Sequence, residues 1–309
     1  MSDDQLLRRY LDHLTEVCNY ARNTVRAHRR ISATWAAFLR TQRGHGIERA
    51  SAEDLLAWIE HREVASVKGS TIAKELCVFR TLYGYLQRSA LVFGNPAASL
   101  PEYICNPPAE KLVLSVEECF AMLRAFDTDS PLGLRNYLIV ALLWSTGLRN
   151  SELCALNWGD IDLDEAVLVV RKGKGGKQRQ IFLNDRVCGD LKRYRRELCP
   201  HDGPARPVFY ALSVNAPDAE DFKRLSTHRV DDIVRLHARD VVGLDKPVNP
   251  LTFRHTFATH MLEAGVDIAD IKEIMGHEQQ TETCVYLHVT MEAAKRFLND
   301  HLANPSKYQ

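Results

Sequence analysis

The sequence predicts a mainly α-helical protein of two domains, with one small β-hairpin or sheet in the second domain. Three observations support this fold class. Apolar residues recur every three or four positions through residues 7–86, which is the period of helices buried on one face. A proline-containing stretch then interrupts the helical pattern. Beyond it, two segments rich in β-branched residues flank a glycine-rich turn, which is typical of a hairpin.

Short helices joined by short connections predict a small bundle over residues 1–100. Ser51 and Asp54 have the spacing of a capping box, so a helix is expected to begin there. The apolar stripes of the four expected helices are Leu7, Tyr10, Leu11 and Leu14; Val25, Ile31, Trp35, Phe38 and Leu39; Leu55, Leu56 and Ile59; and Ile72, Leu76, Phe79, Tyr83 and Leu86.

Residues 101–112 are expected to link the two domains, because Asn106-Pro107-Pro108 cannot continue a helix. The second domain is expected over residues 113–309. Its expected elements are a helix capped by Ser115 and Glu118, strands at 166–171 and 178–183, and helices at 185–198, at 227–238 and from 252 onward.

The formal charge of the chain is zero, because 40 Lys and Arg balance 40 Asp and Glu. Bulk charge therefore gives no argument for a nucleic-acid partner, and only local basic clusters bear on it. Each cluster taken alone is more typical of a solvated surface. The clusters are Arg26, Arg29 and Arg30; residues 171–179; and Lys192, Arg193, Arg195 and Arg196.

Nothing in the sequence indicates a membrane, a secretory signal or a disulfide framework. The longest apolar run, Leu138–Trp144, is far shorter than the roughly 20 residues of a membrane span. The N-terminal residues contain no apolar signal core. The eight cysteines are scattered without a CxxC pair, which favours free thiols over a zinc site. We therefore expect a cytoplasmic protein.

Four segments carry side chains that could act together on a phosphodiester. Taken alone, each also fits an ordinary role: a helix cap, an exposed turn, a helix stop or a half-buried tyrosine. The segments are Ser145-Thr-Gly-Leu-Arg149-Asn-Ser-Glu152, Lys172-Gly173-Lys174-Gly175, Leu251-Thr-Phe-Arg254-His255, and Met275-Gly-His277 followed nine residues later by Tyr286.

Together these residue types fit the transfer of a phosphoryl group. A guanidinium matches phosphate oxygens with two parallel hydrogen bonds, and a tyrosine phenol is a competent oxygen nucleophile. A lysine on a turn can protonate a leaving oxygen. No carboxylate cluster with metal-ligand spacing is apparent, so side chains are expected to neutralise the charge, without a metal or another cofactor.

The motifs resemble those of the tyrosine recombinase (phage integrase) family, which includes Xer recombinases and mobile-element integrases. The resemblance runs from about Leu114 to Leu302 and is carried by TGLRNSEL, RKGKGGKQR, FRHTFATHML and MGHEQQTETCVYLHV. The first domain resembles the family's SAM-like, DNA-binding core-binding domain. The resemblance implies a site-specific recombinase or integrase that cuts and rejoins DNA strands through a 3′-phosphotyrosine intermediate.

The resemblance also assigns a role to each matching residue. Arg149 and Arg254 match the two arginines that hold the non-bridging oxygens of the scissile phosphate. Lys174 matches the general acid for the departing 5′-oxygen. His277 matches a hydrogen-bond donor to the phosphate, and Tyr286 matches the nucleophile.

One position departs from the family's pattern. The family usually has a histidine three residues before the second arginine, where this chain has Leu251, which cannot transfer a proton. The departure bears on rate more than on reaction type, because one acid–base participant contributes about 10²–10⁴-fold. Glu152 matches a family acid that is expected to be structural. A recombinase-derived DNA-binding protein with weakened catalysis and a type IB topoisomerase remain open as alternatives.

The implied partner is double-stranded DNA that carries a specific recombination site, enclosed by the two domains. The resemblance further implies a homotetramer on two sites, joined through the C-terminal segment. In that segment Phe297, Leu298 and Leu302 share one helical face. Integration, excision, resolution and chromosome dimer resolution all remain open as biological roles.

Overall fold

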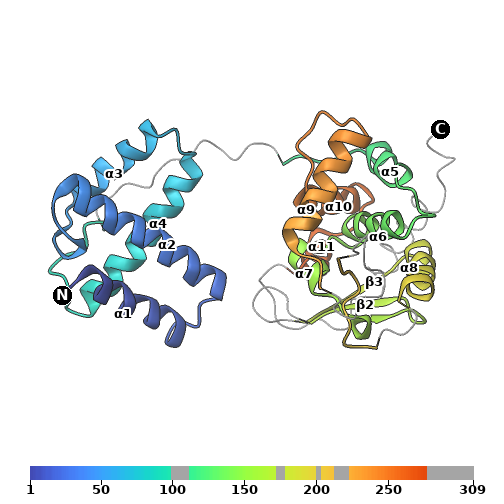
Figure 1. Ribbon diagram of the computed structural model, residues 1–309, viewed down its shortest axis with the longest axis horizontal. Helices are drawn as coiled ribbons and strands as arrows, with labels where there is room; N and C mark the ends of the chain where they lie inside the picture. Colours follow the sequence, from blue (N-terminus) through green and yellow to red (C-terminus); the bar gives the residue numbers. More distant parts are fainter. Residues whose placement is uncertain (99–110, 172–177, 200–202, 212–222, 277–309) are drawn as a thin grey trace. The chain divides into compact units, whose positions relative to one another are not determined.

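The computed structural model describes residues 1–98, 111–171, 178–199, 203–211 and 223–276. The chain divides into two compact units, residues 1–109 and 110–309, each with its own hydrophobic core (Figure 1). Of the predicted linker, residues 101–112, only residues 111 and 112 are described. No helix in these described ranges has the length and hydropathy needed to cross a bilayer.

The first unit is a bundle in which one long helix contacts the other three. Its helices are α1 (Asp3–Glu16), α2 (Arg22–Phe38), α3 (Ala52–Val64) and α4 (Gly69–Arg88). Trp35, Trp58 and Phe79 are fully buried between them and contact one another. The indole N–H of Trp35 donates to the Tyr83 hydroxyl at 2.8 Å, which satisfies both buried polar groups.

The predicted stripes of this bundle are confirmed, with one exception. All five stripe residues of α4 are buried, and Ser51 caps α3 with Asp54 as expected. Leu56, however, is exposed. The helix buries Leu55 and Trp58, and Leu56 lies about 100° around the axis from Leu55, so it faces solvent.

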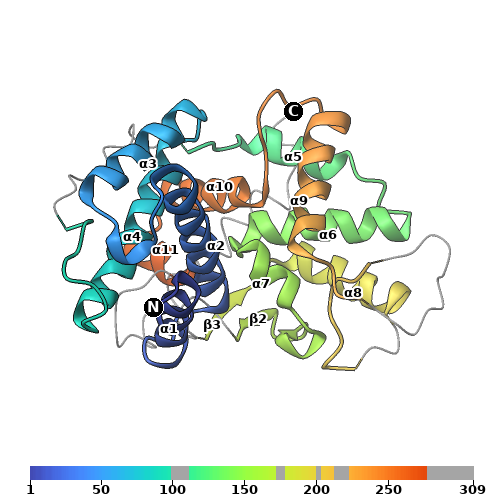
Figure 2. The ribbon, with the colours of Figure 1, turned by 60° about the vertical axis from the view of Figure 1, so that its left-hand side comes forward.

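The second unit is organised around an apolar helix, α6 (Pro131–Thr146), which lies in the middle of the unit and contacts α5, α8, α9 and α10 (Figure 2). Every side chain from Tyr137 to Thr146 is buried. A helix that is apolar all round needs neighbours on every side, and these helices provide them. Besides α6, the α-helices described in this unit are α5 (Val116–Arg124), α7 (Asn150–Ala155), α8 (Asp185–Leu198), α9 (Thr227–Leu236), α10 (Pro250–Glu263) and α11 (Ile268–Ile274).

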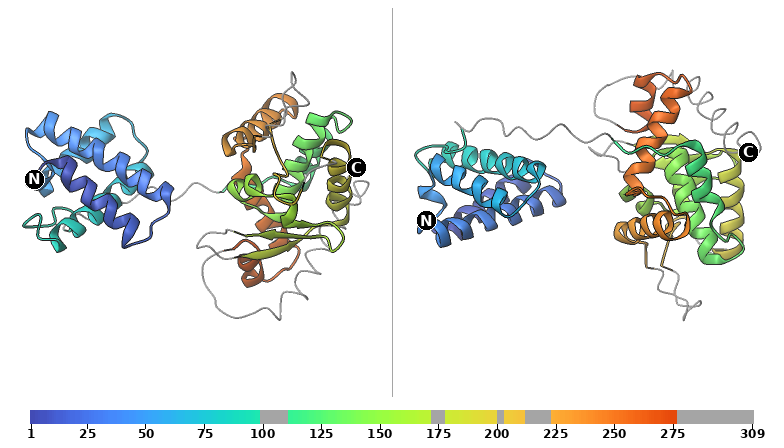
Figure 3. Two further views of the ribbon diagram at one scale, coloured as in Figure 1. Left: turned by 60° about the horizontal axis from the view of Figure 1, so that its bottom comes forward. Right: turned by 90° about the horizontal axis from the view of Figure 1, so that it is seen from above.

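A three-stranded antiparallel sheet forms one side of this unit, in the order β1-β2-β3 (Figure 3). The strands are β1 (Ile161–Asp162), β2 (Val167–Val170) and β3 (Arg179–Phe182). Val170 pairs with Arg179, which confirms the predicted hairpin, although its turn, residues 172–177, lies outside the described residues. No local pattern predicts β1, which is only two residues long. The fold class predicted from the sequence is confirmed.

The helical pattern predicted from residue 252 onward is divided in the structure. Gly265 has φ of +83°, a left-handed conformation that ends α10 and allows the chain to turn into α11. α11 contacts β3, so the end of this helix lies beside the first residue of that strand. The rest of the predicted helical region, residues 277–309, lies outside the described residues.

Candidate active site

The turn between α6 and α7 sets the position of Arg149. Gly147 ends α6 with φ of +61°, and a Cβ at this glycine would lie 2.5 Å from Cδ1 of Phe257. Both the left-handed backbone and the close approach of a ring therefore require glycine here. Arg149 follows two residues later as the N-cap of α7. Its side chain is 26% exposed, so part of its guanidinium faces solvent.

Arg254 reaches the same turn from inside the protein. It lies on α10 and is only 4% exposed. One Nη donates to the carbonyl of Gly147 at 2.6 Å, and the other donates to the carbonyl of Met275 at 2.6 Å. Burial and the nearby Arg149 lower the pKa of Arg254 to about 10, so the group remains charged at neutral pH.

Three arginines from distant parts of the sequence bind three successive carbonyls at the end of α11. Arg179 Nε donates to Ile274 at 2.8 Å, Arg254 to Met275 at 2.6 Å and Arg149 Nη2 to Gly276 at 3.1 Å. The last carbonyls of a helix lack partners within the helix and carry its negative end, so cations are stabilising there. The three guanidinium groups therefore converge on one short piece of backbone.

Glu152 connects two of these arginines. Its carboxylate accepts from both Nη atoms of Arg179 at 3.0 and 2.7 Å, and from Nη1 of Arg149 at 2.7 Å. It also accepts the backbone N–H of Arg149 at 2.9 Å. Burial alone would raise the pKa of Glu152, but these hydrogen bonds outweigh it and lower the pKa from 4.5 to about 2.

The cluster of Arg149, Glu152, Arg179 and Arg254 carries three positive charges and one negative charge, a net +2. A phosphodiester carries one negative charge and gains a second as an oxyanion attacks it. A fixed positive cluster stabilises such a transition state more than the ground state. Among the described residues, Arg149 uses two of its five N–H groups to bind Glu152 and Gly276, and its partly exposed guanidinium can also serve a phosphate.

The depressed pKa of Glu152 predicts a specific loss of stability in acid. A carboxyl with a lowered pKa stabilises the fold fully above its unfolded value, and this stabilisation disappears as the pH falls from about 4.5 through about 2. A shift of this size corresponds to about 3 kcal/mol in the free energy of unfolding. Glu152→Gln is expected to be less stable at pH 7 and to lack this part of the acid dependence.

Urea unfolding measured at several pH values checks this expectation. Glu197→Gln is the matched control, because Glu197 also pairs with an arginine, Arg193 at 3.2 Å, but is 41% exposed. The control should follow the wild-type dependence on pH. If the stability of Glu152→Gln also follows the wild-type dependence on pH, the lowered pKa of Glu152 does not stabilise the fold.

The structure describes two of the five predicted site residues and brings them together. Arg149 and Arg254 bind the adjacent carbonyls of Gly276 and Met275. Lys174, His277 and Tyr286 lie outside the described residues, so their predicted roles stay predictions. His277 is the residue that follows Gly276 in the chain.

Arg179 belongs to the site although its local sequence does not indicate this. It lies in the basic cluster 171–179, and such a cluster taken alone is typical of a solvated surface. In the structure its side chain is 11% exposed and binds Glu152, 27 residues away. The sequence does predict that Arg179 lies at the start of the second strand of the hairpin. No local pattern identifies Glu152 as its acidic partner.

Leu251 lies in the first turn of α10 and is 57% exposed. Its N–H donates to the side chain of Asn249, the N-cap of the helix, at 2.9 Å. His255, one residue after Arg254, has its pKa lowered by burial and by the nearby Lys111 and Arg254, which favours its neutral form. His260 is structural, because it accepts from the Trp144 indole at 3.2 Å and bonds the Leu114 carbonyl at 3.0 Å.

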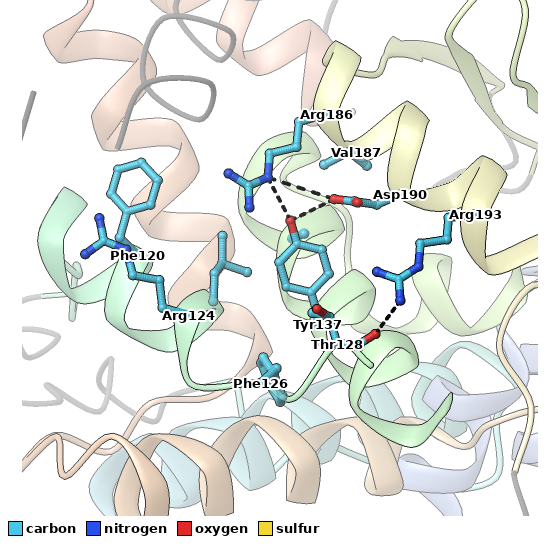
Figure 4. Close-up of a pocket in the computed structure, with 11 residues that line it drawn as sticks. Phe120, Arg124, Phe126, Thr128, Tyr137, Arg186, Val187, Asp190 and Arg193 are labelled. Atoms are coloured by element: carbon cyan, nitrogen blue, oxygen red, sulfur yellow. Dashed lines mark hydrogen bonds and ion pairs between the residues drawn. The ribbon is translucent and has the colours of Figure 1, made fainter. Parts of the chain in front are cut away.

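A separate cavity of about 270 Å³ lies among α5, α6 and α8 and shares no residue with this site (Figure 4). Arg124 lies over the Phe120 ring, and the other two arginines of the cavity are engaged with nearby oxygens. Arg186 bonds the Tyr137 hydroxyl at 3.2 Å and lies 3.9 Å from Asp190, and Arg193 donates to the Thr128 carbonyl at 3.0 Å (Figure 4). In the described part of the chain no three His, Cys, Asp or Glu side chains are grouped as metal ligands.

The chain is similar to known proteins of one family. The sequence profile of the phage integrase family matches residues 113–293, and that of the phage integrase N-terminal SAM-like domain matches residues 7–90. Tyrosine recombinase XerC of Pelotomaculum thermopropionicum is 31% identical over 77% of this chain and 77% of its own length. Tyrosine recombinase XerD of Ralstonia nicotianae is 30% identical over 97% of this chain and 94% of its own length.

Solved structures share the fold at lower identity. The integrase of transposon Tn1549, in complex with a circular intermediate DNA, has a TM-score of 0.68 at 20% identity and covers 93% of this chain and 98% of its own. A lambda integrase dimer bound to a COC′ core site has a TM-score of 0.67 at 17% identity and covers 92% of this chain and 100% of its own. The family profile spans more than half of the chain, and the resemblance found in the sequence is confirmed: the protein belongs to the phage integrase family, the site-specific tyrosine recombinases.

Proposed function

We propose that the protein cuts and rejoins duplex DNA at a specific site, with Tyr286 as nucleophile and with Arg149 and Arg254 holding the scissile phosphate. The observation that carries the proposal is the convergence of these two guanidinium groups on the adjacent carbonyls of Gly276 and Met275. Their positive charge supports a role at a phosphate, because rigid donors in a partly buried site stabilise developing negative charge strongly.

In the proposed reaction the Tyr286 hydroxyl gives up its proton to water as its oxygen forms a bond to phosphorus and the bond from phosphorus to the 5′-oxygen breaks. Lys174 gives its proton to the departing oxygen, and His277 donates to a non-bridging oxygen. Religation reverses these steps when a 5′-hydroxyl attacks the phosphotyrosine. The phosphotyrosine conserves the energy of the broken bond, so the reaction needs no nucleotide cofactor.

We further propose that residues 1–100 bind the recombination site through α2, that 101–112 act as a linker, and that 113–309 carry catalysis. Four arginines on one exposed face of α2 support the first role. Arg26 bonds only Asn23, at 2.9 Å, and no acid pairs with these arginines in the described ranges. The arginines are Arg22, Arg26, Arg29 and Arg30.

The basic cluster on α8 supports a different interpretation. Lys192 pairs with Asp164 at 3.3 Å, and Arg193 and Arg196 pair with Glu197 at 3.2 and 3.4 Å. Local acids therefore pair with three of the four members of this cluster, as on an ordinary solvated helix, and the fourth, Arg195, lies over the Trp158 ring. We assign phosphate contacts to α2 rather than to α8.

We also propose that four protomers assemble on two sites through residues 291–302, and that the protein acts on DNA in the cytoplasm. Phe297, Leu298 and Leu302 give that segment an apolar face in the sequence, which suits a groove on a neighbouring protomer. These residues lie outside the described part of the chain.

The test begins with selection of bound duplexes from a random library, because the target sequence is unknown. The selected site is then built into a suicide substrate, in which a nick releases a short strand and traps the covalent adduct. An adduct that maps to Tyr286, together with exchange between two sites, supports the proposal. Relaxation of supercoiled DNA without two-site exchange would indicate a topoisomerase, and binding without adduct would indicate a DNA-binding protein.

Activity is expected to persist in EDTA, unchanged within about twofold, because protein side chains supply the positive charge in the proposed mechanism. The measurement is single-turnover cleavage of the suicide substrate with and without chelator. A magnesium-dependent endonuclease in the same buffer serves as the control and should stop. Complete loss of cleavage that Mg²⁺ restores would overturn the mechanism.

Leu251→His is expected to leave the reaction type and site affinity unchanged and to raise the cleavage rate modestly, by less than about 10²-fold. Residue 251 lies one helical turn before Arg254 and is more than half exposed, so an imidazole there would have room and access to water. Single-turnover cleavage across pH measures the gain.

Leu262→His is the matched control, because Leu262 is also an exposed leucine of α10, at 53%, but lies two turns beyond Arg254. This variant should behave as wild type. If Leu251→His inactivates the enzyme, another group already handles the proton, and His255 would be the first candidate.

A further inference from the structure

Arg179 binds two separate parts of the site through three side-chain hydrogen bonds. Its Nε binds the Ile274 carbonyl at 2.8 Å, and its two Nη atoms bind both oxygens of Glu152 at 3.0 and 2.7 Å. This paired geometry fixes the plane of the guanidinium as well as its position. Arg179 therefore connects β3, α7 and the end of α11 through one rigid group.

Gly276 shows how closely Arg179 approaches the backbone. This glycine has φ of +65°, and a Cβ on it would lie 3.1 Å from Nη1 of Arg179. A side chain at position 276 would therefore press on the guanidinium and strain the backbone. The chain leaves the described part of the structure at this residue and continues directly to His277.

We infer that Arg179 is a positioning residue of the recombinase: it fixes the end of α11 and, through Glu152, the guanidinium of Arg149. The expected effect of Arg179 on cleavage rests on the proposed function, whereas its expected effect on α11 does not. Arg179 has committed three of its N–H groups to protein atoms, whereas Arg149 binds Glu152 and Gly276 with two. Of these two arginines, Arg149 is therefore the one suited to bind phosphate, and Arg179 is the one that holds Arg149 in place.

The same hairpin offers a matched control. Arg171 follows β2 directly, as Arg179 begins β3, and it also binds one carboxylate and one carbonyl. Its partners are Asp160 and the carbonyl of Gly159, the latter at 3.0 Å. Neither partner belongs to the candidate site, so Arg171 matches Arg179 in chemistry and differs from it in position.

The first experiment measures hydrogen exchange of the free, full-length protein, which requires no DNA site. Met275 and Gly276 donate their N–H groups to Ile271 and Glu273 at 3.0 and 2.9 Å, and these bonds open when the end of α11 frays. Arg179→Ala is expected to speed exchange in residues 268–276 by about tenfold or more, because the end of the helix would lose a hydrogen bond from a charged donor. Arg171→Ala should leave these residues unchanged. Equal exchange in both variants would overturn the inference.

The second experiment measures single-turnover cleavage and site affinity for the same variants. Arg179→Ala is expected to cleave about 10²-fold more slowly, since small misplacements in a site have effects of this size, with affinity for the site nearly unchanged. Added guanidinium chloride, compared with sodium chloride at equal ionic strength, should restore part of the rate, because the Arg179 side chain is 11% exposed and leaves an accessible space.

The change in the cleavage rate of Arg179→Ala on adding guanidinium chloride distinguishes a positioning role of Arg179 from a role in general stability. Guanidinium weakens folding, so a variant that is slow only because it is partly unfolded would become slower still. A rate that falls further with guanidinium, or a rate equal to that of Arg171→Ala, would overturn the inference. If wild type cleaves no selected site at all, the proposed function fails, and the exchange experiment still tests the position of α11.

Discussion

Tyr286→Phe is expected to abolish the covalent protein–DNA adduct while leaving affinity for the recombination site within about threefold of wild type. The substitution removes the only proposed nucleophilic oxygen, and loss of a nucleophile costs about 10⁴-fold or more. Affinity should persist because phosphate contacts made elsewhere supply most of it. The measurement is adduct formation on a suicide substrate, with affinity determined on an uncleavable duplex.

Tyr308→Phe is the matched control for this experiment. Tyr308 is the other tyrosine that follows Gly276 in the sequence, so it is the natural competitor for the role of nucleophile. It should form adduct at the wild-type rate. Adduct formed by Tyr286→Phe, or lost in Tyr308→Phe, would reassign the nucleophile.

Arg149→Ala and Arg254→Ala are each expected to lower the cleavage rate on the order of 10³-fold, because each removes a fixed donor from the transition state. Lysine should recover more activity at position 149 than at position 254. Arg149 is partly exposed, whereas Arg254 is 4% exposed and binds two carbonyls with a planar fork that lysine lacks. Single-turnover rates, with unfolding curves for each variant, test the ranking.

Arg135→Ala controls for the loss of a buried arginine as such. Arg135 is also buried, and it donates to the carbonyl of Tyr210 at 3.0 Å, away from the candidate site. Its removal should lower stability without slowing cleavage by the folded protein. Alanine and lysine variants of equal activity at both positions 149 and 254 would indicate that those arginines are only structural.

The helices were predictable because their patterns are local. In α4 the buried residues repeat with the helical period, and in α8 the ends of the helix coincide with residues 185 and 198 as expected. Leu56 was misassigned because the stripe of α3 is short, and only packing against α4 decides which of two adjacent leucines turns inward. β1 exists only because β2 pairs with it, which no local pattern expresses.

The same distinction between local patterns and long-range contacts applies to the candidate site. Arg149 and Arg254 were predictable because short motifs carry them, and the turn at Gly147 belongs to one of those motifs. The link between Arg179 and Glu152 was not predictable, because it depends on how the hairpin packs beside α11. Pairing between charges distant in sequence is a property of the folded chain, and in this protein it completes the site.

The three arginines at the end of α11 bind its backbone carbonyls and none of its side chains. The core constrains the buried residues Ile271, Ile274 and Met275, and the arginines add a constraint on the length of the helix. A substitution at an outward-facing position keeps every carbonyl in place, but inserting or deleting one residue rotates the end of the helix by about 100° and moves it by about 1.5 Å. Related chains should accordingly tolerate exchanges of residues along α11 while rarely changing the number of residues between Gly265 and Gly276.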